Sequence, residues 1–349
     1  MTEIYNWKPS AETDLTQRAL DCMKSHQVVA LPTETVYGLF VLDHPVALDR
    51  LYQLKGRDVA KPMAHYVADL LQAESRAGYF PPAARRLAQA FWPGPLTIGI
   101  ESKDGLTRGW RCSSHPLIRR LAAMSERTLL GTSANRSGEE PLATADAIHA
   151  AFDGALGMVV RDDTTDPRAA STVVMVRSAP RVPDDRHVIL RAGGITADQL
   201  VDPLRLQILF ICTGNTCRSP LAEVIAKKLV ADRDPNVRPR FLSAGLAAWL
   251  GDPASSGSLG IATAMGLDLS SHRSQPVGPE LIDSSDLIFT MTESHRARLV
   301  SLFPEYESRI HRLDPAGDVL DPIGAATDVY RQCAEQITRS LRLQLEKWT

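Results

Sequence analysis

The strongest constraint on this chain is an apolar strand that runs straight into a cysteine-containing loop and a helix start: Ile208-Leu209-Phe210-Ile211-Cys212-Thr213-Gly214-Asn215-Thr216-Cys217-Arg218-Ser219-Pro220. A proline such as Pro220 is typical of the first turn of a helix. The amides of such a loop and the helix N-terminus favour a thiolate and hold phosphate oxygens. The planar guanidinium of Arg218 matches two of those oxygens. The stretch therefore predicts a cysteine, Cys212, that attacks a phosphoryl group.

Length and composition are those of a globular protein of two domains. The chain has 349 residues, of which 44% are hydrophobic and 23% charged, and a domain takes about 100–200 residues. Basic and acidic residues number 23 and 23 in residues 1–200, and 16 and 18 in the rest, so bulk charge does not predict nucleic-acid binding. No run approaches the roughly 18 apolar residues of a membrane span. Five scattered cysteines favour a reducing cytoplasm over a disulfide framework.

Glycine and proline residues near residue 200, which commonly interrupt helices and strands, predict a boundary between two α/β domains. Gly193-Gly194 and Asp202-Pro203 mark the end of a domain over residues 1–198 and a linker over 199–205. Residues 206–349 then alternate strands and helices, which predicts a doubly wound parallel sheet. Its expected strands are Leu206–Ile211, Arg240–Ser243 and Asp286–Met291, and its expected helices are Ser219–Asp232, Gly257–Gly266, Glu293–Ser301 and Val329–Trp348.

The first domain has a mixed pattern, which predicts a twisted mixed sheet with helices. Strands are expected at Gln27–Leu31, Thr97–Ile100, Ser171–Val176 and His187–Leu190, and helices at Pro45–Leu54, Pro82–Trp92 and Leu117–Ser125. The pattern does not fix the order of the strands.

The second domain resembles the low-molecular-weight protein phosphatase family over residues 206–349. The matching text is Cys212 to Glu223, then Ser243-Ala244-Gly245, Gly266 to Ser274, Asp286 to Met291 and Asp321-Pro322. The resemblance implies that Cys212 attacks phosphorus, Arg218 stabilises the equatorial oxygens, and Asp321 protonates the leaving group and then activates water. The implied phosphate loop comprises Thr213, Gly214, Asn215, Thr216, Cys217 and Ser219, with Ser219 supporting the thiolate and Asn215 fixing the loop. No cofactor is implied.

Alternative roles stay open for Cys217 in this loop and for the distant Asp321. Cys217 is either inert or a disulfide partner for Cys212 under oxidation. An Asp-Pro pair such as Asp321-Pro322 is also common in plain turns. A protein that only binds phosphoproteins is a further alternative, against which the intact Cys212, Arg218 and Asp321 argue.

The expected phosphatase substrate is a phosphoprotein, with phosphoarginine favoured over phosphotyrosine. Family members that act on phosphotyrosine usually carry an aliphatic residue at the position of Thr216 and aromatics just after the acid. This chain has Thr216 and reads Asp321-Pro322-Ile323-Gly324. It resembles the related protein arginine phosphatases at both points.

A second series of motifs fills the first domain. It comprises Pro32 to Leu39, Lys55-Gly56-Arg57, Lys61-Pro62, Arg111 to Pro116, Gly131 to Gly138, Ser171 to Val174 and Arg191-Ala192-Gly193. Hydroxyls, amides and basic side chains in this pattern suit a ligand that carries several phosphates. Over about residues 10–198 the series resembles the YrdC-like threonylcarbamoyl-AMP synthase family.

This resemblance implies synthesis of threonylcarbamoyl-adenylate from threonine, bicarbonate and ATP, for a tRNA adenosine modification. The implied ATP-binding residues are Lys55, Arg57, Lys61, Ser133, Asn135 and Arg191, and the implied threonine-binding residues are Thr35, Arg111 and Ser171. The resemblance also implies Mg²⁺ that bridges the phosphates, contact with tRNA or other RNA, and a protein that mainly positions its reactants.

The chain departs from the synthase pattern at several positions. Tyr66 stands where the family usually has His, Met175 where it has Asp, and Ser113 where it has Pro; Asp162-Asp163-Thr164 replaces a glycine pair. The alternative is therefore a nucleotide- or RNA-binding module without turnover, joined to an active phosphatase.

Overall fold

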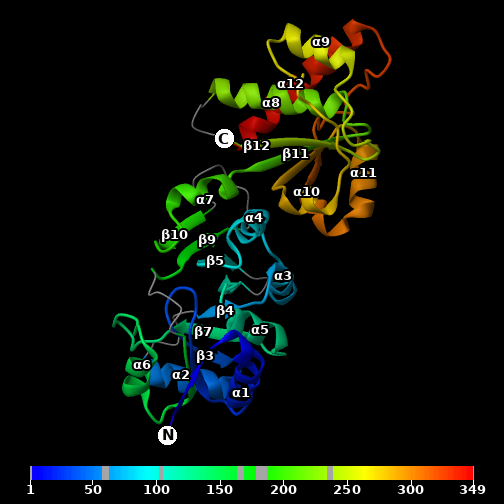
Figure 1. Cartoon of the computed structure of the whole chain (residues 1–349). Coiled ribbons are helices and arrows are strands. Elements are labelled where there is room, and N and C mark those ends of the chain that lie inside the picture. The colour runs from blue at the N-terminus through cyan, green and yellow to red at the C-terminus, as the bar shows by residue number, and fades with distance from the viewer. Residues whose placement is uncertain are drawn as a thin grey trace. The chain divides into compact units, whose positions relative to one another are not determined.

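The chain folds into two compact units, which are described one at a time. The computed structural model describes residues 2–56, 63–101, 105–162, 169–177, 187–233 and 239–348 (Figure 1). The first unit contains the described residues up to 204, and the second begins at Arg205. Within the described residues, no helix has the length and apolar character that a membrane crossing needs.

The second unit is built on a parallel sheet with the order β12-β11-β13-β14. Its strands are β11 (Gln207–Cys212), β12 (Arg240–Gly245), β13 (Leu287–Thr290) and β14 (Ile310–Arg312). Its helices are α8 (Arg218–Arg233), α9 (Ser256–Ala264), α10 (Pro279–Ser284), α11 (Glu293–Leu302) and α12 (Thr327–Trp348), with a 3₁₀ turn at Pro304–Arg309. Figure 1 shows α8, α9 and α12 on one face of the sheet and α10 and α11 on the other.

Alternation along β11 explains why both faces of this sheet are covered. Ile208 and Phe210 pack into the core with α8, α9 and α12. Leu209 and Ile211 lie on the opposite face, where they pack against a cluster that contains Ile282. A strand buried on both sides reads as a continuous apolar run. The predicted doubly wound parallel sheet is therefore confirmed, and Cys212 ends its central strand at the carboxyl edge.

The first unit is a mixed sheet, with the order β1-β8-β2-β3-β7-β4-β6-β5-β9-β10 among the described strands. The strands are β1 (Glu3–Asn6), β2 (Val28–Leu31), β3 (Gly38–Leu42), β4 (Ala64–Tyr66), β5 (Leu96–Glu101), β6 (Thr107–Arg111), β7 (Leu129–Ser133), β8 (Leu156–Arg161), β9 (Thr172–Val176) and β10 (His187–Arg191). The helices are α1 (Glu12–Lys24), α2 (Pro45–Lys55), α3 (Leu70–Ala77), α4 (Pro82–Phe91), α5 (Pro116–Met124), α6 (Ala145–Phe152) and α7 (Ala197–Leu204), after a 3₁₀ turn at Pro9–Ala11.

Three hydrophobic clusters stabilise the first unit. Helices α1 and α5 cover one face of the sheet, while α2 and α6 cover the other. A third cluster joins α3, α4 and α7 to the sheet end formed by β5, β6 and β9. The predicted mixed α/β fold is confirmed.

The segment predicted as a linker, residues 199–205, lies almost wholly in helix α7. Leu200 and Leu204 stand one helical turn apart and are buried in the cluster that contains α4. The Pro203 carbonyl also accepts a hydrogen bond from Arg86 Nε at 2.8 Å. The linker prediction is wrong because a proline in the last turn removes only one backbone hydrogen bond from a helix whose apolar side remains buried.

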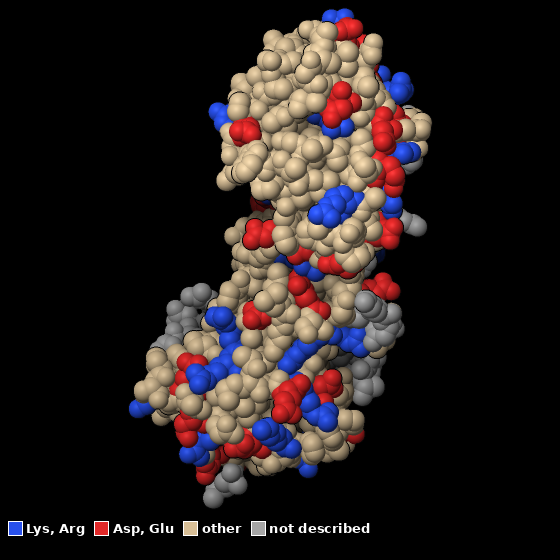
Figure 2. All heavy atoms as spheres, turned by 90° about the vertical axis from the view of Figure 1, so that its right-hand side faces the viewer, with Lys and Arg blue, Asp and Glu red and all other residues tan. Residues whose placement is uncertain are grey.

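Charge is interspersed on the surface. Figure 2 shows Lys and Arg mixed with Asp and Glu over each unit on the face drawn. This distribution agrees with the near-balance of 39 basic and 41 acidic residues in the sequence.

Candidate active sites

The loop after β11 surrounds the Cys212 sulfur with hydrogen-bond donors. Cys212 is 2% exposed. Its Sγ accepts the Asn215 backbone N–H at 3.2 Å and lies 3.0 Å from the Ser219 hydroxyl oxygen. Helix α8 begins at Arg218, so its positive N-terminus adjoins the loop. An amide, a hydroxyl and a helix N-terminus thus surround the sulfur.

Asn215 holds the loop in a conformation that few residues adopt. Its φ is 55°, in the left-handed region where Asn is tolerated better than most residues. Its Nδ2 donates to Ser219 Oγ at 3.0 Å and its Oδ1 accepts the Gln275 N–H at 2.9 Å. The Asn215 carbonyl also accepts from His272 Nε2 at 2.7 Å. The fully buried side chain therefore ties the loop to two other segments.

Arg218 and Asp321 form an ion pair at the mouth of the loop. Arg218 Nη2 lies 2.6 Å from Asp321 Oδ2, with the arginine side chain 5% exposed and the aspartate side chain 47% exposed. Weaker contacts join Arg218 to the Val319 carbonyl at 3.5 Å and to Thr213 Oγ1 at 3.4 Å. The structure thus brings the predicted nucleophile loop, arginine and acid together from segments about 100 residues apart in sequence.

Sequence reasoning missed His295, which supports the loop from helix α11. Its Nε2 lies 2.8 Å from Thr213 Oγ1, and its Nδ1 lies 2.8 Å from Thr292 Oγ1. Burial, followed by the nearby positive charge of Arg218, lowers the pKa of His295 to about 4. The neutral ring therefore connects α11 to residues 212–218, the predicted catalytic loop. The available signal was a histidine just after the buried strand β13, at the carboxyl edge of the sheet.

Three large apolar side chains are exposed on segments that contact the loop or the acid. Trp249 and Leu250 are each 81% exposed, and Ile323 is 70% exposed. The segment that leads to Trp249 hydrogen-bonds to the loop, since Leu246 N–H donates to the Cys212 carbonyl at 3.0 Å. Ile323 follows the acid, and its N–H donates to Asp321 Oδ1 at 3.3 Å. These three exposed residues are called the apolar rim. Trp249 was missed because it follows the Ser243-Ala244-Gly245 match without belonging to any motif.

The remaining loop residues have structural partners. The Thr216 carbonyl accepts the Ser255 N–H at 2.9 Å, while its half-buried side chain stays at the loop surface. Cys217 Sγ lies 3.3 Å from Ser255 Oγ and 3.9 Å from the Tyr330 hydroxyl. Cys212 and Cys217 are both free thiols, so both readings of Cys217 stay open.

The first unit contains a cavity of about 220 Å³ on its central sheet. It lies along a row of neighbouring positions on β3, β7, β4, β6, β5 and β9. Small residues create the hollow: a Cβ on Gly131 would lie 2.7 Å from the Tyr66 ring. The lining includes four predicted residues, Arg111, Ser133, Ser171 and Arg191, and three that were not predicted, Tyr66, Thr97 and Thr132.

Arg111 is the best-anchored charge in this cavity. Its Nη2 donates to Glu34 Oε1 at 2.8 Å and to Thr35 Oγ1 at 2.7 Å, and its Nη1 donates to the Tyr66 hydroxyl at 3.2 Å. Burial favours the neutral form, but Tyr66 and Glu34 outweigh it and raise the pKa of Arg111. The Ser113 hydroxyl donates to the other oxygen of Glu34. Thr35 therefore supports Arg111 rather than lining the cavity.

Arg191 is a second cation at the same cavity. Its Nε donates to the Ser171 carbonyl at 3.0 Å and its Nη2 to Ser171 Oγ at 2.8 Å. The Thr97 hydroxyl lies 3.0 Å from Ser171 Oγ. Burial and the neighbouring charge of Arg111 lower the pKa of Arg191. Two guanidinium groups that repel each other favour an anion between them. The buried Nε of Arg111 also has no hydrogen-bond acceptor among the described residues.

Lys55, Ser133 and Asn135 form a cluster that adjoins the cavity through Ser133, and the two other predicted ATP-binding residues lie outside the description. Lys55 is the last residue of α2 and is 2% exposed. Its Nζ donates to the carbonyls of Ser133 and Asn135 at 2.6 and 2.8 Å, so it holds the turn after β7. Ser133 Oγ donates to Asn135 Oδ1 at 2.5 Å. Arg57 and Lys61 lie outside the described residues.

Comparison with known proteins matches each unit to a family. The family described as "Telomere recombination", which includes the YrdC-like proteins, matches residues 21–193. The family described as "Low molecular weight phosphotyrosine protein phosphatase" matches residues 207–347.

Individual relatives support both matches. A protein-arginine-phosphatase of Bacillus subtilis is 36% identical over 41% of this chain and 98% of its own length. A threonylcarbamoyl-AMP synthase of Chromohalobacter salexigens is 38% identical over 42% of this chain and 88% of its own. The chain belongs to both families, one in each unit. It is also similar to a low molecular weight protein-tyrosine-phosphatase of Staphylococcus haemolyticus, 40% identical over 38% of this chain and 92% of that protein.

The synthase-family relatives differ in length. The chain spans about half, 54%, of the threonylcarbamoyl-AMP synthase of Bacillus subtilis, whereas it spans nearly all of the arginine phosphatase from the same organism. The fusion of a YrdC-like unit to a low-molecular-weight phosphatase unit is thus supported by the comparisons as well as by the sequence motifs.

Proposed function

We propose that this fusion is bifunctional, with a cysteine-dependent protein phosphatase in the second unit and a threonylcarbamoyl-AMP synthase in the first. The observation that carries the proposal is the Cys212 sulfur held by Asn215 N–H and Ser219, with the Arg218–Asp321 pair beside it. A nucleophile, a cation for the equatorial oxygens and an acid are the parts that phosphoryl transfer through sulfur requires.

The proposed phosphatase reaction has two steps. Cys212 Sγ forms a bond to phosphorus while the bond to the leaving group breaks, and Asp321 donates its proton to the departing atom. Water then attacks phosphorus, Asp321 takes a proton from it, and the sulfur–phosphorus bond breaks to release inorganic phosphate. The incoming phosphate draws Arg218 away from Asp321, which leaves the acid free to work in the first step.

Phosphoarginine is the proposed substrate in preference to phosphotyrosine. Thr216 adds a hydroxyl where an apolar contact would suit a phenol ring, and the rim residue after the acid is the aliphatic Ile323. Relatives named for either activity are similarly close in sequence, so the choice depends on a measurement.

Turnover of both phosphoamino acids by one preparation tests this preference. Thr216→Ile should shift the ratio of kcat/KM values toward phosphotyrosine, while the surface substitution Thr263→Ile should leave the ratio unchanged. A strong preference of the unmodified chain for phosphotyrosine would reject phosphoarginine but keep the phosphatase mechanism.

The first unit is proposed to join threonine, bicarbonate and ATP. The threonine nitrogen bonds to the bicarbonate carbon with loss of water, the resulting carbamate oxygen attacks the α-phosphorus, and pyrophosphate leaves. Arg111 and Arg191 would hold the carboxylate and carbamate, because both guanidinium groups face a cavity sized for a small anion. ATP would bring Mg²⁺ on its phosphates, and tRNA is proposed as the eventual acceptor of the product.

A second candidate is a nucleotide- or RNA-binding unit without turnover. It is favoured by Lys55, which is committed to the turn after β7, and by Tyr66, whose hydroxyl accepts from the predicted threonine ligand Arg111. Pyrophosphate release that needs both threonine and bicarbonate supports the synthase. ATP binding without such release supports the binding unit instead.

A further inference from the structure

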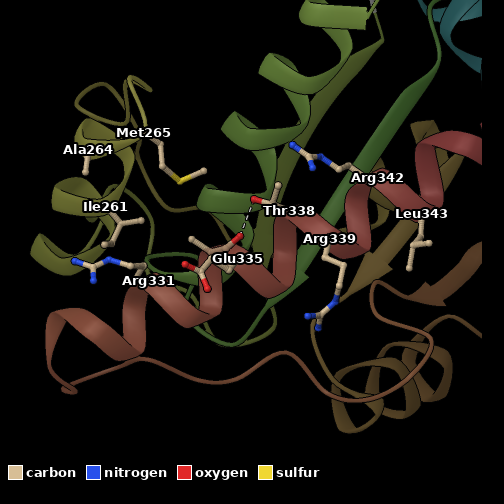
Figure 3. Close-up of a pocket in the computed structure, with 10 residues that line it drawn as sticks. Ile261, Ala264, Met265, Arg331, Glu335, Thr338, Arg339, Arg342 and Leu343 are labelled. Carbon is tan, nitrogen blue, oxygen red and sulfur yellow. Dashed lines mark hydrogen bonds between the residues drawn. The ribbon is translucent and has the colours of Figure 1, made fainter.

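A groove between helices α9 and α12 is separate from both proposed active sites. Its volume is about 580 Å³, and none of its ten lining residues belongs to the catalytic loop or the apolar rim. Figure 3 shows Ile261, Ala264 and Met265 on the α9 side, with Arg331 and Glu335 of α12 nearest to them and Arg339, Arg342 and Leu343 farther along α12. The groove is therefore an open surface feature of the second unit that the phosphatase chemistry does not use.

The base of the groove is apolar and partly open to solvent. Ile261 is buried, Met265 is half-buried, and Leu343 on α12 is 47% exposed. Covering such surface stabilises a complex by about 25 cal/mol per Å² of apolar area. Methionine also adapts its shape to different partners. The base thus suits an apolar side chain from outside.

Three arginines and one glutamate of α12 line the groove, so its charge is mostly positive. Arg331 and Arg342 lie eleven residues apart in sequence, which corresponds to about 16 Å along a helix. Neither side chain has a hydrogen bond or an ion pair within the described residues. Arg339 is 68% exposed, with a long contact of 3.8 Å to Asp314. Glu335 lies between Arg331 and Arg339. A complementary occupant carries acidic groups toward both ends, opposite the arginines. It carries a positive group near one third of its length, opposite Glu335.

This charge pattern discriminates between classes of occupant. Nucleic acids and anionic membranes present only negative charge, so Glu335 would oppose them. The lining also contains no aromatic ring on which a base could stack. A spacing of about 16 Å matches three turns of a peptide helix, whereas a small anion would reach only one of the two outer arginines.

We propose that the α9–α12 groove docks an acidic amphipathic segment of a partner protein, bound as a helix in a groove. Its apolar stripe would lie on Ile261, Met265 and Leu343, and its flanking carboxylates would pair with Arg331 and Arg342. This proposal does not depend on which phosphoamino acid Cys212 attacks.

The full chain is used to select binders from a displayed library of random peptides, each roughly 16 residues, or about four helical turns, long. The enriched peptides are the probe. The enriched peptides should carry Asp or Glu on both sides of an apolar stripe. Their affinity, measured by fluorescence polarisation, should fall by about tenfold or more for Arg331→Glu/Arg342→Glu. The control Arg233→Glu/Arg298→Glu makes the same change in net charge at exposed positions outside the groove and should retain binding.

A second pair of variants tests the apolar base. Leu343→Asp should weaken the peptides, whereas Leu302→Asp on α11 should not, although the two leucines are 47% and 46% exposed. Unchanged aryl phosphate hydrolysis by all variants shows that the second unit is folded. Peptides that bind the groove variants as tightly as the unmodified chain would overturn the proposal. It would also be overturned if single-stranded RNA or phosphatidylserine vesicles, rather than any acidic peptide, lost binding through these substitutions.

Discussion

Asn215 offers a direct test of how the catalytic loop is held. Asn215→Ala removes the acceptor for the Gln275 N–H and the donor to Ser219 Oγ. Leaving a buried amide unpaired costs about 1–3 kcal/mol, and losing the second hydrogen bond costs about 0.5–1.5 kcal/mol. Alanine at φ 55° adds about 1 kcal/mol of backbone strain. The expected loss of stability in the second unit is about 2.5–5.5 kcal/mol.

Asn215→Gly separates the two contributions. Glycine accepts a positive φ without strain, so this variant should lose only the hydrogen-bond part and be about 1 kcal/mol more stable than Asn215→Ala. The midpoint of urea inactivation, followed by aryl phosphate hydrolysis, reports the second unit in the full chain. Both variants should also lower kcat/KM, because the loop amide of residue 215 would no longer be fixed toward Cys212.

His26 is the matched control for the backbone part. It is the other non-glycine residue with a positive φ, 60°, in the described chain, and it lies in the first unit. His26→Ala and His26→Gly should leave aryl phosphate hydrolysis unchanged. Equal stability of Asn215→Ala and Asn215→Gly would refute the backbone argument. Full stability and activity of Asn215→Gly would refute the role of the hydrogen bonds.

Three further outcomes are expected. Asp321→Asn should lower turnover of phosphoamino acids by about 10²–10⁴-fold but slow p-nitrophenyl phosphate much less, because that leaving group needs little protonation; equal losses on both substrates would contradict an acid role. Since the folded-state pKa of His295 is about 4 and its unfolded value is near 6.5, its contribution to stability is complete above pH 6.5 and is lost as pH falls toward 4. His295→Gln should flatten that part of the curve of urea midpoint against pH, and an unchanged slope would show that another group titrates. Glu34→Gln should raise the KM for threonine by about tenfold because Arg111 loses its charged partner, while aryl phosphate hydrolysis stays constant; an unaltered KM would remove Glu34 from the site.

The sequence predicted those parts of the fold that depend on local patterns. The run Ile208–Ile211 identified a buried strand because both of its faces are covered, and the loop that follows depends on residues that are neighbours in sequence. The helix α7 was missed because Asp202-Pro203 resembles a break, whereas the burial of Leu200 and Leu204 depends on α4. Tertiary packing therefore overrode the local signal.

The candidate sites likewise divide into residues that are neighbours in sequence and residues that tertiary packing brings together. Cys212, Asn215, Arg218 and Ser219 lie in one motif, and the structure brings Asp321 to them. His295 reaches the catalytic loop, and the segment before Trp249 contacts it, only because the carboxyl ends of parallel strands meet at one edge of the sheet. In the first unit, Lys55 was expected at a ligand but holds the turn after β7. Sequence alone does not reveal which basic side chain is already satisfied by backbone carbonyls.

The central claim is that one chain carries two separate catalytic sites, and a crossed pair of variants tests it most directly. Aryl phosphate hydrolysis and pyrophosphate release dependent on threonine and bicarbonate are measured on the full chain, on Cys212→Ser and on Arg111→Ala. We expect Cys212→Ser to lose hydrolysis by about a thousandfold or more with pyrophosphate release intact, and Arg111→Ala to show the reverse. Hydrolysis that survives Cys212→Ser, or the absence of threonine-dependent pyrophosphate release from the unmodified chain, would contradict the account.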